Sequence, residues 1–150
     1  MSNLHNTALD LIESGGRVFP SSKGLKTPVT PNGYLDATDD PDTVEAYWQR
    51  NPNYNIGVPT EGILILDVDG KDNPWLTVER AEALARTGCP ITVTPRGGRH
   101  YWFRQPERAK WRNTTGRENG SGIAPKVDTR ADGGYALVPP SATSDGQYKY

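Results

Sequence analysis

Apolar residues recur at helical spacing in three segments of the chain. Two of these segments begin with an aspartate or asparagine followed by proline, the residues preferred at the N-cap and in the first turn of a helix. Glycines or an Asn-Pro pair mark where the segments end. Helices are therefore predicted from about residue 4 to Gly15-Gly16, from Pro41 to Asn51, and from Pro74 to Arg86.

Other apolar runs have the length and residue types of strands. The run GILILDVD, residues 62–69, is apolar on both faces, which predicts a central strand covered on at least one side. A hairpin is predicted next, with ITVT and RHYWFR joined by a Pro-Arg-Gly-Gly turn. Further strands are predicted at residues 17–20, 55–58, 124–130 and 135–138, a polar loop at 107–121, and a last hairpin at Asp145-Gly146.

Length and charge narrow the possible classes of protein. A chain of 150 residues fits one compact domain, or two small lobes that share a core. Its 17 basic and 18 acidic residues give a formal net charge of −1. A strongly basic domain is typical of nucleic-acid binding, so any such binding here is expected from a local patch or from a partner.

Few residues could build a disulfide or a zinc site. Cys89 is the single cysteine, which excludes an intramolecular disulfide, and two histidines add too little for a Cys/His zinc cage. The N-terminal residues contain acidic side chains and no long apolar run. We therefore expect neither a signal peptide nor a membrane anchor, and a cytoplasmic protein that uses no zinc.

Two carboxylates stand at the end of the central predicted strand. Asp67 and Asp69 project from the same face, because side chains alternate along a strand. At a separation of ~4 Å two such charges repel by roughly 4 kcal/mol at an effective dielectric of 20. A cation or a shared proton relieves this repulsion. The alternative is a solvated strand end with an Asp-Gly turn.

Three kinds of site could use this pair. A calcium-binding loop needs glycine at its sixth position and glutamate at its twelfth, where this chain has Asp72 and Val78. A haloacid-dehalogenase-like phosphatase fits ILILDVDG, but in that family the pair opens the domain and threonine usually follows the glycine, whereas here Lys71 follows. A metal pair for nucleotidyl transfer needs another carboxylate and a group for a triphosphate.

Both further requirements are met later in the chain. Asp128, in KVDTR, ends another predicted strand and supplies a third carboxylate. His100 follows a glycine-rich turn, where backbone amides and basic side chains can approach an anion. A histidine after a tight hairpin can equally be an ordinary surface residue. The residues of this turn that could contact a nucleotide are Arg96, Gly97, Gly98 and Arg99.

With these motifs the chain resembles a known family, the bifunctional primase–polymerase domain. This domain stands at the N-termini of phage and plasmid replication proteins and belongs to the archaeo-eukaryotic primase superfamily. The resemblance implies an α+β fold, with a small N-terminal α/β unit packed against an RNA-recognition-like antiparallel sheet that carries the active site. The matching segments are RVFP, GYLDAT, NIGVPT, ILILDVDG, TVTPRGGRHYWF, KVDTR and GGYALVPPS.

The resemblance also implies roles for individual residues. Asp67, Asp69 and Asp128 would be metal ligands, and His100 would contact the triphosphate. Arg130 projects on the same face as Asp128, and it could either anchor the nucleotide or pair with that carboxylate. The nucleotide-binding candidates are His100, Arg96, Gly97, Gly98, Arg99, Arg130, Lys26 and Ser141, although Lys26 could be a solvated loop lysine and Ser141 a turn serine.

The implied activity is template-directed nucleotidyl transfer, by a DNA primase and DNA polymerase that uses two Mg²⁺ or Mn²⁺ ions. Its partners would be dNTPs or NTPs, a single-stranded DNA template and a primer, with a replicative helicase module in the same or a neighbouring chain. Residues 1–150 would form the catalytic domain, in the cytoplasm of a bacterial or phage-infected cell. The alternatives are a haloacid-dehalogenase-like phosphohydrolase and a non-catalytic nucleotide- or DNA-binding module.

Overall fold

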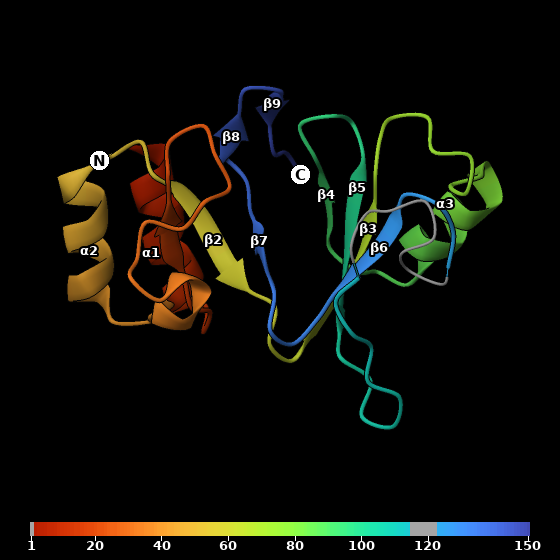
Figure 1. Ribbon diagram of the computed structural model, residues 1–150, viewed down its shortest axis with the longest axis horizontal. Helices are drawn as coiled ribbons and strands as arrows, with labels where there is room; N and C mark the ends of the chain where they lie inside the picture. The colour runs from red at the N-terminus through yellow and green to blue at the C-terminus, as the bar shows by residue number, and fades with distance from the viewer. Residues whose placement is uncertain (1, 115–122) are drawn as a thin grey trace. The chain divides into compact units, whose positions relative to one another are not determined.

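The computed structural model describes residues 2–114 and 123–150, which form helices and antiparallel sheets (Figure 1). The α+β class predicted from the resemblance is therefore confirmed. The chain divides into two compact units. Unit 1 comprises Met1–Pro59 with Tyr135–Lys149, and unit 2 comprises Thr60–Gly134 with Tyr150. In the described residues, no helix is long and apolar enough to cross a membrane.

Unit 1 contains two α-helices and a three-stranded antiparallel sheet in the order β1-β2-β7. The helices are α1 (Asn3–Glu13) and α2 (Pro41–Arg50), and a short 3₁₀ helix, η1, spans Gly33–Asp36. The strands are β1 (Phe19–Ser21), β2 (Asn55–Pro59) and β7 (Tyr135–Leu137). A small hairpin, β8 (Ala142–Thr143) with β9 (Gly146–Gln147), confirms the turn predicted at Asp145-Gly146.

Side-chain caps and close packing explain how the sequence forms unit 1. Asp40 accepts a hydrogen bond from the backbone nitrogen of Thr43 at 3.0 Å, so the N-cap predicted for α2 is confirmed. Phe19 lies over β2, where a Cβ on Gly57 would come within 2.3 Å of its ring. Only glycine lets the ring pack there.

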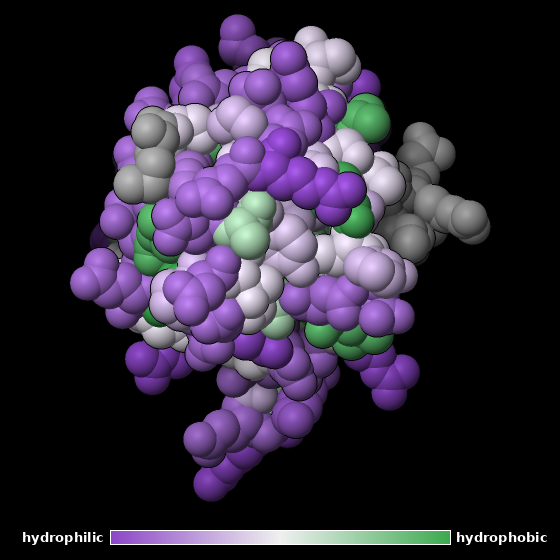
Figure 2. All heavy atoms as spheres, turned by 90° about the vertical axis from the view of Figure 1, so that its left-hand side faces the viewer, coloured by the Kyte–Doolittle hydropathy of each residue, from purple (hydrophilic) through white to green (hydrophobic). Residues whose placement is uncertain are grey.

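The surface on the α2 side is mainly hydrophilic, with scattered apolar residues (Figure 2).

Unit 2 is built on a four-stranded antiparallel sheet in the order β4-β5-β3-β6. Its strands are β3 (Ile63–Val68), β4 (Ile91–Val93), β5 (Arg99–Arg104) and β6 (Val127–Arg130), and its helix is α3 (Val78–Arg86). One face of the sheet packs against an apolar cluster that includes Leu84 of α3. The other face carries Asp67, His100 and Asp128 beside the apolar Ile65 and Trp102, and we call it the polar face.

The third predicted helix starts later than its sequence suggests. It begins at Val78 with Thr77 as N-cap, so the prediction of a start at Pro74 was wrong. The reason lies in Asn73, whose amide nitrogen donates to the backbone oxygens of Asp69 and Lys126 at 3.0 and 3.1 Å. Asn73 therefore ties the loop after β3 to the chain before β6 instead of capping a helix.

The polar loop predicted at residues 107–121 lies partly outside the described residues, from 115 onward. Its described part ends beside β6, where the backbone nitrogen of Thr114 donates to the oxygen of Thr129 at 2.9 Å. Asn113 also accepts from the nitrogen of Ala131 at 2.8 Å. Residues 112–114 thus lie along the outer edge of the sheet of unit 2.

Candidate functional site

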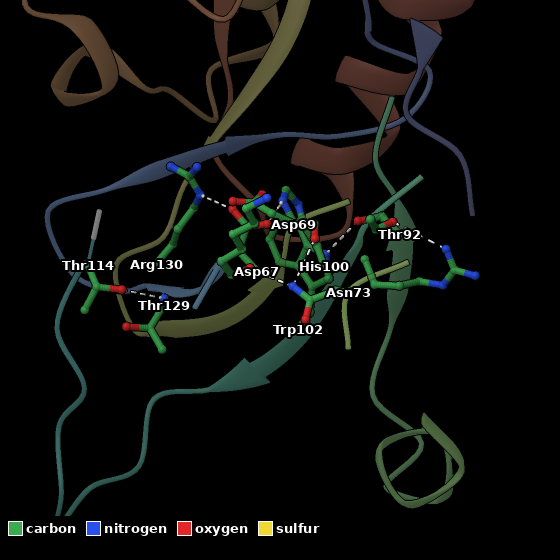
Figure 3. A network of polar contacts seen from close by, with 12 residues as sticks. Asp67, Asp69, Asn73, Thr92, His100, Trp102, Thr114, Thr129 and Arg130 are labelled. Atoms are coloured by element: carbon green, nitrogen blue, oxygen red, sulfur yellow. Dashed lines mark hydrogen bonds and ion pairs between the residues drawn. The ribbon is translucent and has the colours of Figure 1, made fainter. Parts of the chain in front are cut away.

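A row of polar residues crosses the sheet of unit 2 on its polar face. The strand register places Thr92 opposite His100, His100 opposite Asp67, and Asp67 opposite Asp128. Residues directly opposite in antiparallel strands project to the same side of the sheet. Asp67, His100 and Asp128 are only 4–5 % exposed. Four separate strands therefore deliver these side chains to one small, largely desolvated area. Figure 3 shows Thr92, His100 and Asp67 in this area.

Asp67 is held between two nitrogen donors. Its Oδ1 lies 3.3 Å from Nε2 of His100, and its Oδ2 accepts from Nε of Arg130 at 3.2 Å. Burial acts to raise the pKa of Asp67, but the hydrogen bond and charge of His100, with the guanidinium of Arg130, outweigh burial and hold that pKa below its ordinary value. Asp67 is therefore ionised, and Arg130 pairs with it rather than with Asp128.

Asp69 lies just beyond β3, in a more repulsive setting. Burial, the charges of Asp67 and Asp128, and a hydrogen bond with Asp67 raise the pKa of Asp69 to about 6, although Arg130 opposes the shift. The three carboxylates that the sequence singled out are therefore close enough to repel one another. Such repulsion favours binding of a cation, which stabilises the ionised form of all three.

Asp128 is oriented by a threonine that sequence analysis missed. The hydroxyl of Thr114 lies 3.0 Å from Oδ1 of Asp128, and the same hydroxyl oxygen accepts from the backbone nitrogen of Thr129 at 2.9 Å. The hydroxyl of Thr114 donates to this carboxylate oxygen while one of its lone pairs accepts from Thr129, so it can make both hydrogen bonds at once. Thr114 stands in a polar segment without periodicity, so no pattern in the sequence marked it.

The glycines before His100 have a structural role in the described residues. A Cβ on Gly98 would lie 2.3 Å from the backbone oxygen of Val68, so glycine is required where the turn meets the end of β3. Gly97 has a φ of +84°, which favours glycine, and its backbone nitrogen donates to Thr94 within the turn. Arg99 donates to the backbone oxygens of both glycines, at 3.2 and 3.4 Å. Contact between this turn and a nucleotide stays a prediction.

Two predicted nucleotide-binding residues belong to unit 1. Ser141 is fully buried, and its hydroxyl oxygen accepts from the backbone nitrogen of Ile56 at 2.8 Å, which gives it a structural role beside β2. Lys26 is exposed, and its backbone oxygen accepts from the hydroxyl of Tyr135 at 3.1 Å. The polar row lies in unit 2, and the nucleotide-binding roles of both residues stay predictions.

The chemistry of the carboxylates suits a hard divalent cation. Carboxylate oxygens are the ligands that Mg²⁺ and Mn²⁺ prefer, and Asp67, Asp69 and Asp128 offer several of them. Within residues 2–114 and 123–150, no three His, Cys, Asp or Glu side chains already form a metal-binding group. His100 and Arg130 engage the oxygens of Asp67 instead. A cation would therefore have to replace these contacts at Asp67 or share them.

Most of the chain matches a known protein family. It matches the model of a protein family described as bifunctional DNA primase/polymerase, N-terminal, over residues 8–150. The match spans both units and includes all three carboxylates, His100 and Arg130. A search among curated proteins gave no significant match.

Proposed function

The chain belongs to the family of bifunctional DNA primase/polymerase N-terminal domains, and from that premise we propose that it joins nucleotides on a DNA template through the carboxylates of unit 2. The observation that carries the proposal is the row across the sheet, in which Asp67 pairs with both His100 and Asp128. Family membership implies a nucleotidyltransferase, and the row offers the charges that such a reaction needs.

Each side chain has a role that its surroundings support. Asp67, Asp69 and Asp128 would hold two Mg²⁺ or Mn²⁺ ions, which, when bound, lower the pKa of a 3′-hydroxyl and offset the charge of the triphosphate. His100 would donate to the triphosphate through Nε2, which now contacts Oδ1 of Asp67 and would be released when a cation binds that oxygen. Arg130, with a side chain 40 % exposed, can leave Asp67 and bind a phosphate oxygen at little cost in burial.

The arrangement of strands supports the archaeo-eukaryotic primase fold. Since β3 and β4 are both antiparallel to β5, they run parallel to each other, and α3 connects them with β5 inserted between. This is a split β-α-β unit, the element from which RNA-recognition-like sheets are built. The two central strands of the sheet, β3 and β5, carry Asp67 and His100 respectively.

Wider aspects of the proposal rest on the resemblance. We propose that residues 1–150 act as one catalytic domain in phage or plasmid replication, in the cytoplasm of the host cell. The substrates would be dNTPs or NTPs, with a single-stranded template and a primer. A helicase module, in the same or a neighbouring chain, would open the duplex ahead of it.

Primer extension tests the proposed function. A labelled primer on a single-stranded template should be extended in the presence of dNTPs and Mg²⁺ or Mn²⁺. Asp67→Asn and Asp69→Asn should abolish extension, because each removes a charge from the cation site. Asp72→Asn is the matched control, since Asp72 is exposed and lies in the loop after β3 that also contains Asp69. Extension that survives both Asp67→Asn and Asp69→Asn would contradict the proposal.

A further inference from the structure

A basic loop leaves unit 2 directly after β5. We define the basic loop as Arg104–Arg112, with the sequence RQPERAKWR. These nine residues contain four of the 17 basic residues of the chain and only one of its 18 acidic residues. The loop extends away from the sheet of unit 2 (Figure 1). A chain whose net charge is near zero therefore concentrates positive charge in one exposed segment.

One side chain closes the basic loop. The amide nitrogen of Gln105 donates to the backbone oxygen of Trp111 at 3.1 Å, and the amide oxygen of Gln105 accepts from the backbone nitrogen of Trp111 at 3.0 Å. The side-chain amide of Gln105 thus makes the same pair of hydrogen bonds with the backbone of Trp111 that a residue of a neighbouring strand would make. This contact fixes the base of the loop, so a ligand that binds to it has less conformational entropy to remove.

The basic loop begins on the strand that carries the candidate site. Side chains alternate along β5, so His100 and Arg104 project to the same polar face. Four residue steps at ~3.3 Å per residue separate them by about 13 Å. The basic loop therefore begins on the same face of β5 as His100, at the end of the same strand.

We propose that the basic loop binds single-stranded DNA, with Arg108 and Lys110 on phosphates and a base stacked on Trp111; this rests on the proposed function, which supplies a single-stranded template. Trp111 is 43 % exposed, although burial of a tryptophan is ordinarily favourable. Basic side chains next to exposed aromatic rings are the usual means of binding single strands without sequence preference. An acidic protein that bound to this loop would use its positive charge, but it would not need an exposed aromatic ring for stacking.

The proposal predicts a specific salt dependence. Each phosphate contact on a single strand contributes about 0.7 to the slope of log K against log salt. Removal of the charges of Arg108 and Lys110 should therefore lower the slope by roughly 1.4. Between 50 and 200 mM salt, the affinity of the unmodified chain should then fall about sevenfold more than that of the double variant.

Fluorescence anisotropy of a labelled oligothymidylate tests the proposal, since this strand forms no duplex. The variants are Arg108→Gln with Lys110→Gln together, and Trp111→Ala, with Trp111→Phe as the conservative replacement. Trp111→Ala should weaken binding about fivefold or more, and Trp111→Phe should restore most of it. The charge control is Arg86→Gln, compared with Arg108→Gln alone, because Arg86 is an exposed arginine on α3. Thermal melts check that each variant folds.

Three results would overturn the proposal: no binding of oligothymidylate by the unmodified chain, equal losses in Arg86→Gln and Arg108→Gln, or equal competition by polyglutamate and by unlabelled oligothymidylate. Oligothymidylate binding requires neither metal nor turnover. A chain that binds it through the basic loop but extends no primer would refute the proposed function and leave this inference intact. A chain that extends a primer while the loop variants bind normally would refute the inference alone.

Discussion

Replacement of Thr114 by valine tests whether the carboxylate of Asp128 must be oriented. Threonine and valine have nearly the same shape, so Thr114→Val removes the hydroxyl and little else. The structure assigns two hydrogen bonds to that hydroxyl, one donated to Oδ1 of Asp128 at 3.0 Å and one accepted from the nitrogen of Thr129 at 2.9 Å. Both are lost in the variant.

The expected effect on metal binding is large. Groups that orient metal ligands typically change metal affinity or activity by about 10–100-fold when they are removed. We therefore expect Thr114→Val to raise the Kd for Mn²⁺, measured with a triphosphate present, by roughly that factor. The free energy of unfolding should also fall by about 1–3 kcal/mol, because the buried nitrogen of Thr129 loses its hydrogen-bond partner. Thr114→Ser keeps the hydroxyl and should bind Mn²⁺ normally.

Thr129→Val is the matched control for Thr114→Val. The hydroxyl of Thr129 donates to the backbone oxygen of Arg112, so it holds the same segment against β6 without contact to Asp128. Mn²⁺ titration followed by electron paramagnetic resonance separates free from bound ion in each variant. Equal losses of affinity in both valine variants, or normal affinity in Thr114→Val, would refute the view that Thr114 orients Asp128.

Three further predictions follow from the site. Mn²⁺ with a triphosphate should raise the Tm, because ligand at 100 Kd stabilises the folded state by about 2.7 kcal/mol. Asp67→Ala or Asp128→Ala should remove this rise, and an unchanged rise in these variants would place the ligand elsewhere. His100→Ala should weaken triphosphate binding in calorimetry and leave Mn²⁺ binding without nucleotide nearly intact, whereas loss of that Mn²⁺ binding would make His100 a metal ligand. Gly98→Ala should lower the free energy of unfolding in urea by roughly 1–3 kcal/mol, because its Cβ would meet the backbone oxygen of Val68 at 2.3 Å; unchanged stability would mean that the turn can move.

Local signals in the sequence predicted most of the elements. Asp40 before Pro41 marked the start of α2, and the apolar run at residues 63–68 marked β3 as a central strand. The same reasoning failed at Asn73 before Pro74, because its amide nitrogen donates to the backbone oxygen of Asp69 in the preceding loop and to that of Lys126, 53 residues away. A cap signal indicates that a side chain can bind backbone groups, but tertiary structure determines which ones.

The site was harder to predict than the elements. The alternation of residues placed Asp67 and Asp69 on one face, but only strand pairing shows that Asp128 lies opposite Asp67. The prediction that Arg130 could pair with Asp128 did not anticipate its position opposite Ile65, from which its guanidinium reaches Asp67 on the neighbouring strand. The contact between Asp67 and Arg130 joins residues 63 apart in the sequence, and it depends on the register between their strands, which the periodicity of each strand does not determine.

Simultaneous measurement of pyrophosphate and inorganic phosphate tests the central claim most directly. With a primed template, dNTPs and Mn²⁺, the chain should release one pyrophosphate for each nucleotide added and no inorganic phosphate, and Asp128→Asn should abolish the release. A phosphohydrolase that used Asp67 as nucleophile would release inorganic phosphate without a template. Release of inorganic phosphate that persists in Asp128→Asn would contradict nucleotidyl transfer by the three carboxylates.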